Sequence, residues 1–273
     1  MITIKHPLNN DRFHVFTTDD AAGPTLGLNH FLVSRSGTLI SGPTRLGSFR
    51  TTEGIAATSH ANGRDIWVTI QESGSENLHS YLITGDGNVS APVTSSGVVS
   101  IKGGDSERGG LAFSFDGSRF VSAHPNNYRN PNDRGIRVLN FNSSTGAFSN
   151  PLNIIQETLY WPYDVTFSPD GSHVYYSSGQ GDLYACSISA KTISKIDVAS
   201  AKQFAAIEIG PDGNLYQASG GSNGGNLRKI TGDLNTGGPF TLSEISGTET
   251  SLGLPTMYIP PTEKLQTNSV GIL

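Results

Sequence analysis

The chain has few of the residues that would place it in several large classes of protein. It carries one cysteine, Cys186, in 273 residues, which excludes an intramolecular disulfide framework. No apolar run approaches the roughly 20 residues that a membrane-spanning helix needs. Only 15% of residues are charged, the formal net charge is -5, and the lysines and arginines are scattered rather than gathered in a stripe. We therefore expect neither membrane insertion nor a nucleic-acid partner.

Signatures of common catalytic sites are also missing. The seven histidines form no His-Glu-x-x-His arrangement and have no cysteine partner at metal-site spacing. No Gly-x-Ser-x-Gly elbow precedes a helix, which excludes a serine hydrolase of the α/β type. The first residues, Met1 to Pro7, lack the basic and apolar regions of a signal peptide. A complete catalytic motif therefore cannot be written from the sequence.

Turn residues are abundant, and they recur. The chain has 33 glycines and 14 prolines, and no segment keeps a 3.6-residue apolar period, so helix is expected to be nearly absent. One turn signature appears as Phe113–Gly117, Phe167–Gly171 and Ile209–Gly213, with weaker copies at Ala61–Gly63 and Asn9–Asp11. The copies are about 52, 54, 54 and 42 residues apart. This period is typical of radial repeats.

Each copy is surrounded by strand patterns. In the fourth copy, Tyr163–Phe167 precedes the Asp-Gly pair and His173–Tyr176 follows it, which predicts a hairpin. Two further strand patterns follow, at Asp182–Ile188 and Thr192–Ile196, and four antiparallel strands make one propeller blade. The sequence therefore predicts an all-β protein, a β-propeller of five four-stranded blades.

The whole chain is expected to form one domain. The repeats run roughly over 1–50, 51–104, 105–159, 160–200 and 201–260, and 261–273 is a tail. The segment Leu254–Pro260 could close the ring by completing the first blade, but Ile2–Lys5 competes for the same innermost position. If both were innermost strands, a sixth partial blade would exist. We favour five blades, with a ring closed by the N- and C-terminal strands.

Several segments resemble one family. The runs Asn10–Asp20, Asn62–Val68, Tyr160–Gly171 and Leu252–Thr256 are similar to blade segments in the propellers of large bacterial surface proteins of the gliding-motility and type IX secretion kind. More distantly, Phe-Ser-Pro-Asp-Gly resembles repeats of TolB-type and WD-repeat propellers. The resemblance implies a bacterial propeller at the cell surface or outside the cell. The chain lacks the family's additional upstream blade and its downstream sorting domains.

The loops between second and third strands are unequal in length. They lie on the propeller face opposite the Asp-Gly hairpins; those at 18–29 and 124–135 are long, and the one at 124–135 is rich in amide side chains. Its Asn126, Asn127, Tyr128 and Arg129 could bind a sugar or peptide, or form only an Asn/Pro-rich turn. Trp161 and Tyr163 could form an aromatic sugar platform, or could pack between blades.

Counting back from the turns places charged residues on the innermost strands. Glu53, Arg108, Asp164 and Glu208 are expected near the central funnel. Glu53 and Arg108 are candidate ligand-binding residues, and Glu53, Asp105 and Asp164 are candidate metal ligands, with Ca²⁺ the cation that such oxygen donors suit. The alternative is a wet channel of solvated groups and salt bridges. No other cofactor is predicted.

Two functions from different classes fit these patterns. The first is a non-enzymatic adhesion module that presents its loops to a glycan or protein on a cell surface. The second is a propeller enzyme, a lactonase-like hydrolase or lyase with a divalent metal in the funnel; a phage tail or receptor-binding component would look the same. We favour the adhesion module, because the loops differ strongly in length and no complete set of catalytic residues can be named.

Overall fold

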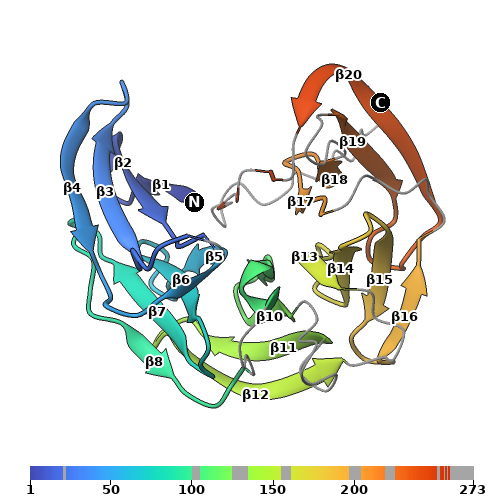
Figure 1. Cartoon of the computed structure of the whole chain (residues 1–273), viewed down its shortest axis with the longest axis horizontal. Helices are drawn as coiled ribbons and strands as arrows, with labels where there is room; N and C mark the ends of the chain where they lie inside the picture. Colours follow the sequence, from blue (N-terminus) through green and yellow to red (C-terminus); the bar gives the residue numbers. More distant parts are fainter. Residues whose placement is uncertain are drawn as a thin grey trace, which may run out of the picture.

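The computed structural model describes residues 1–20, 23–99, 105–124, 135–154, 161–196, 204–218 and 225–250, with positions 253, 254, 256 and 258. Its twenty strands form five sheets of four antiparallel strands, arranged as the blades of a propeller around one axis (Figure 1). The described residues contain no α-helix, and none of their segments is a helix long and apolar enough to cross a membrane. The five-blade prediction is confirmed.

The strands follow one another outward in every blade, so the first strand of each lies nearest the axis (Figure 1). The first blade holds β1 (Ile2–His6), β2 (Asn9–Thr17), β3 (Asn29–Ser34) and β4 (Leu39–Arg45). The second holds β5 (Thr51–Ser59), β6 (Ile66–Glu72), β7 (Leu78–Ile83) and β8 (Val93–Ser95). The third holds β9 (Leu111–Phe113), β10 (Arg119–His124), β11 (Gly135–Asn142) and β12 (Ala147–Ile154), preceded by the 3-10 turn η1 (Asp105–Arg108).

The last two blades repeat this order. The fourth holds β13 (Pro162–Phe167), β14 (His173–Ser178), β15 (Leu183–Ser187) and β16 (Thr192–Lys195). The fifth holds β17 (Ile207–Ile209), β18 (Leu215–Ala218), β19 (Gly225–Gly232) and β20 (Phe240–Thr250). The entrances of β5, β9, β13 and β17 therefore meet around the axis, which is where the charged residues counted from the turns should lie.

The recurring Asp-Gly turn is a structural device. In the fourth blade, Ser168 Oγ donates to Asp170 Oδ1 at 2.8 Å, and the same carboxylate oxygen accepts the Ser172 backbone N–H at 2.9 Å. Gly171 has φ 72°, in the left-handed region that favours glycine. The third and fifth blades repeat this at Gly117 (φ 69°) and Gly213 (φ 75°). The most recognisable motif of the sequence therefore holds hairpins between first and second strands.

Four apolar clusters join successive blades. The first-to-second cluster contains Ile2, Ile4, Phe16, Ile55, Val68 and Tyr81. The second-to-third contains Ala56, Trp67, Leu78, Leu111, Phe120 and Phe141; the third-to-fourth contains Val121, Val138, Val165 and Tyr176. The fourth-to-fifth contains Tyr175, Leu183, Ile207, Leu215 and Ile230. Within the described ranges, no comparable cluster joins the fifth blade to the first.

A different contact spans that side of the ring. The innermost position of the first blade belongs to β1, and Thr256 forms a parallel bridge with Ile2 beside it. Tyr258 Oη is hydrogen bonded to Ser59 Oγ of β5 at 2.8 Å. The N-terminal strand and the C-terminal segment thus meet where the ring closes, and the described C-terminal positions form no strand of a sixth blade.

Candidate functional site

A pocket of about 170 Å³ opens at the entrances of the innermost strands, and we call it the funnel pocket. It is lined by Glu53, Gly54, Ile55, Arg108, Gly109, Gly110, Leu111, Tyr163, Asp164, Val165, Ala206, Ile207, Glu208, Leu254 and Thr256. Four of these are charged, and each comes from a different blade: Glu53 from β5, Arg108 from η1, Asp164 from β13 and Glu208 from β17. The pocket therefore combines three carboxyl groups and one guanidinium.

Glycines bring the second, third and fourth blades close together at this pocket. A Cβ on Gly54 would lie 2.7 Å from the backbone oxygen of Gly109, and a Cβ on Gly110 would overlap Asp164 Oδ1. The Gly110 backbone N–H donates to the Tyr163 backbone oxygen at 2.8 Å, which links the third blade to the fourth. Asp164 can therefore take this position only because Gly110 has no side chain.

We expect Gly110→Ala to lower the free energy of unfolding by about 1–3 kcal/mol, because the added methyl group must displace the Asp164 carboxylate or move β13. Urea denaturation measures this. Gly253→Ala is the matched control, since a Cβ there meets nothing within 4 Å, and it should change stability by less than about 0.5 kcal/mol. Equal stability of the two variants would contradict this account of Gly110.

Asp164 is a strongly perturbed carboxyl group of the pocket. Its Oδ2 accepts the Ile207 backbone N–H at 2.9 Å, and its Oδ1 accepts the Val165 backbone N–H at 3.0 Å. Burial raises the pKa of Asp164 to about 6, although the two amide hydrogen bonds act in the opposite direction. A carboxyl group with this pKa is mostly ionised at pH 7 and still basic enough to accept a proton.

Tyr163 shows that these charges act on one another. Burial raises its pKa to about 12, the carboxylates of Asp164 and Glu53 add to the rise, and the guanidinium of Arg108 opposes it. The phenol therefore keeps its proton at neutral pH and can donate a hydrogen bond. The funnel pocket thus offers carboxylate bases, a protonated phenol and one cation within mutual electrostatic range.

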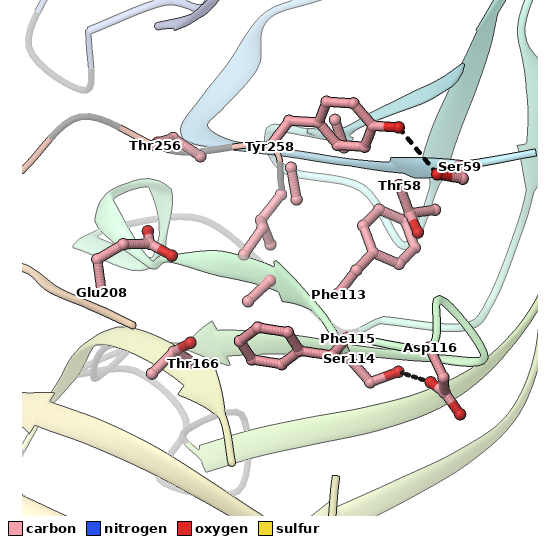
Figure 2. A pocket seen from close by; sticks show the side chains of 14 residues that line it. Thr58, Ser59, Phe113, Ser114, Phe115, Asp116, Thr166, Glu208, Thr256 and Tyr258 are labelled. Carbon is pink, nitrogen blue, oxygen red and sulfur yellow. Dashed lines mark hydrogen bonds between the residues drawn. The ribbon is translucent and has the colours of Figure 1, made fainter. Parts of the chain in front are cut away.

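A second pocket, of about 90 Å³, continues from the first toward the hairpin turns (Figure 2). We call it the turn-side pocket. It shares Leu111, Glu208 and Thr256 with the funnel pocket and is lined otherwise by Ala56, Ala57, Thr58, Ser59, Ala112, Phe113, Ser114, Phe115, Asp116, Thr166 and Tyr258. Glu208 and Thr256 therefore line both pockets, and Figure 2 shows them among the residues around the turn-side pocket.

The structure brings together some of the residues expected from the sequence. Glu53, Arg108, Tyr163 and Asp164 all line the funnel pocket. Trp161 does not line it and instead stacks on Phe204, with 6.3 Å between ring centroids. Packing is thus the role that the described contacts give to Trp161.

The remaining candidates cannot be placed. Asn126, Asn127, Tyr128 and Arg129 lie outside the described residues, as does the side chain of Asp105. Among the described side chains, no group of three or more His, Cys, Asp or Glu could hold a metal ion. The described side chains therefore do not assemble the expected Ca²⁺ site, and we assign no chemical step to a metal.

No protein-family model matches the sequence, and neither does any curated protein. Solved structures share the fold. The periplasmic gluconolactonase PpgL of Pseudomonas aeruginosa is 12% identical with a TM-score of 0.59, over 90% of this chain and 70% of that one. A candidate 6-phosphogluconolactonase of Bacteroides uniformis is 19% identical with a TM-score of 0.52, over 86% and 67%. A chain of a nidogen/laminin complex is 15% identical with a TM-score of 0.50, over 92% and 82%.

At these identities the comparisons establish the propeller fold alone. They give no support to the gliding-motility part of the resemblance. The prediction of a non-enzymatic adhesion module is wrong in their light, because the neighbours named for an activity are lactonases. Loop length was a poor guide, since a long loop shows tolerance to insertion as readily as recognition. The names of these neighbours favour the propeller-enzyme alternative.

Proposed function

We propose that the chain is a propeller hydrolase that opens a small cyclic ester, a sugar lactone, in the funnel pocket. The observation that carries the proposal is the convergence of Glu53, Arg108, Asp164 and Glu208 from four blades on one pocket. The names of the solved lactonases with this fold support the same reaction class. At about 170 Å³, the pocket is smaller than typical drug-sized sites, which favours a single small ring as substrate.

Lactone hydrolysis needs a base, a stabiliser of negative charge and a proton donor, and the pocket holds a residue for each. Asp164 accepts a proton from the attacking water, whose oxygen forms a bond to the carbonyl carbon. Arg108 stabilises the negative charge that develops on the carbonyl oxygen. The ring C–O bond then breaks, and the ring oxygen leaves as a hydroxyl group with the proton that Asp164 took from the water, while Tyr163 donates a hydrogen bond to that oxygen.

The direct test is hydrolysis of glucono-δ-lactone by the purified chain, followed by proton release in weak buffer and corrected for spontaneous opening. We expect kcat/KM on the order of 10⁴ M⁻¹s⁻¹ or higher, within the usual range of enzymes. Arg108→Met should lower kcat/KM about 100-fold, as removal of one oxyanion-stabilising donor does. A rate equal to buffer with glucono-δ-lactone, its 6-phosphate and a γ-lactone would overturn the proposal.

A further inference from the structure

The C-terminal residues follow the axial channel from one pocket to the other. Leu254 lines only the funnel pocket, Thr256 lines both pockets, and Tyr258 lines only the turn-side pocket. Thr256 is bridged in parallel to Ile2, so this part of the chain runs alongside β1, the innermost strand of the first blade. These three residues therefore form part of the channel wall, although they belong to no blade.

This wall lies on the side of the ring between the fifth blade and the first. Successive blades are joined by apolar clusters, but the described residues give no such cluster between the fifth and first blades. In Figure 1 the described C-terminal positions, drawn in red, lie on that side between β17 and β1. Within the fifth blade, Asp212 Oδ2 accepts hydrogen bonds from Lys229 Nζ at 2.7 Å and from Tyr216 Oη at 2.9 Å. These polar contacts lie outside the apolar cluster that joins the fourth blade to the fifth. Among the described residues, then, no apolar cluster between the fifth and first blades closes the pocket.

One hydrogen bond fixes the far end of this wall. Tyr258 Oη and Ser59 Oγ are 2.8 Å apart, and the tyrosine ring packs against the cluster between the first and second blades (Figure 2). The two residues are 199 positions apart in sequence. Since Leu254 and Thr256 precede Tyr258 by a few residues, their place against the funnel pocket depends on where Tyr258 is held.

We infer that Leu254 and Thr256 complete the substrate pocket and that the Tyr258–Ser59 hydrogen bond is the latch that holds them there. Tyr258 is thereby a positioning residue, which acts on the substrate only through its neighbours. The inference rests on the proposed lactone hydrolysis for its functional part. The position of the wall stands on the bridge and the hydrogen bond alone.

The kinetic test uses Tyr258→Phe, Ser59→Ala and the double variant. Each single variant should raise KM for glucono-δ-lactone about 5-fold and change kcat less than 2-fold, because Asp164 and Arg108 are held by other blades. The double variant should be no worse than either single variant, since both remove the same bond. Unchanged KM in both single variants, or a fall in kcat alone, would overturn the latch.

A second measurement does not depend on activity. Replacing Ile2 and Thr256 by cysteine should give a disulfide on oxidation, because bridged residues have the short separation that a disulfide needs. The native Cys186 is buried and burial raises its pKa to about 12, so it should not compete. Mass spectrometry detects the loss of two hydrogens. Absence of the cross-link under conditions that leave the protein folded would overturn the position of the wall.

The two measurements combine in one variant. In the Tyr258→Phe background, the oxidised Ile2→Cys/Thr256→Cys protein should recover the lower KM of the same cysteine pair with Tyr258 intact, and reduction should abolish the recovery. A cross-link without recovery would show that the latch has no role in substrate binding. A cross-link in a protein that hydrolyses no lactone would overturn the proposed function and the latch's role in it, while the wall would stay where the bridge puts it.

Discussion

Replacing Asp164 by asparagine is expected to lower kcat/KM for glucono-δ-lactone at least 100-fold. The amide cannot accept the proton of the attacking water, and general-base catalysis is typically worth 10²–10⁴-fold. The shape of the side chain is preserved, and its remaining oxygen can still accept the Ile207 backbone N–H that now bonds Oδ2. The loss should therefore appear in turnover while the circular dichroism spectrum of the folded protein stays unchanged.

The pH profile distinguishes a base from a structural carboxylate. Since burial raises the pKa of Asp164 to about 6, wild-type kcat/KM should rise with pH through about 6 and level off above it. Asp212→Asn is the matched control, because Asp212 lies in an exposed turn and is bonded to Lys229. It should keep wild-type activity and the same profile. An Asp164→Asn enzyme within 3-fold of wild type would remove Asp164 as the base.

The repeat in the sequence was enough to predict the fold. Asp-Gly turns need a glycine in the left-handed region, and the Ser–Asp hydrogen bonds around them restrict the neighbouring residues, so the signature marks the hairpins of the third and fourth blades. The weak copy at Asn9–Asp11 was misplaced, because the first hairpin turns at Pro7 and Leu8 and Asn9–Asp11 lie in β2. Once the hairpins are placed, the innermost strands are placed too. Counting back from the turns brought Glu53, Arg108, Asp164 and Glu208 to the axis, where the structure has them.

The contacts that close the site could not be predicted from the sequence in the same way. The Tyr258–Ser59 contact joins residues 199 positions apart and follows no repeat, so its partners could not be paired from the sequence. Leu254–Pro260 was correctly considered near the first blade, but its single bridge to Ile2 gives no strand pattern of its own. Gly54 and Gly110 were missed because a glycine that permits close approach looks, in sequence, like any other in a glycine-rich chain.

Lowering the pH from 7 to 4.5 is expected to cost about 3 kcal/mol of folding free energy, and the cause lies in two buried histidines. His14 and His124 are 0% and 2% exposed, and burial lowers the pKa of each to about 3. His30 and His6 add to the effect on His14, and Arg137 adds to that on His124. In both rings one nitrogen, His14 Nε2 or His124 Nδ1, has no hydrogen-bond partner among the described residues.

The direction follows from proton uptake. As the pH falls below about 6.5, the unfolded chain protonates both histidines while the folded protein does not, so stability is lost progressively down to pH about 3. At pH 4.5, about two units below 6.5, this amounts to about 5 kcal/mol for the two rings together, at 1.36 kcal/mol for each pH unit. Asp164 acts oppositely: its folded pKa is raised to about 6, so the folded protein takes up a proton first and regains about 2 kcal/mol.

Urea denaturation between pH 7 and 4.5 measures the balance, and variants assign it. His124→Gln should halve the histidine part of the loss, because glutamine does not titrate and can still bond Ser122, whose Oγ is 2.9 Å from His124 Nε2. His173→Gln is the control, since His173 is only partly buried at the start of β14 and is bonded to the neighbouring Ser172. If His124→Gln loses as much stability as wild type over this range, the acid sensitivity must come from other groups, because a buried neutral histidine cannot be removed without changing the slope.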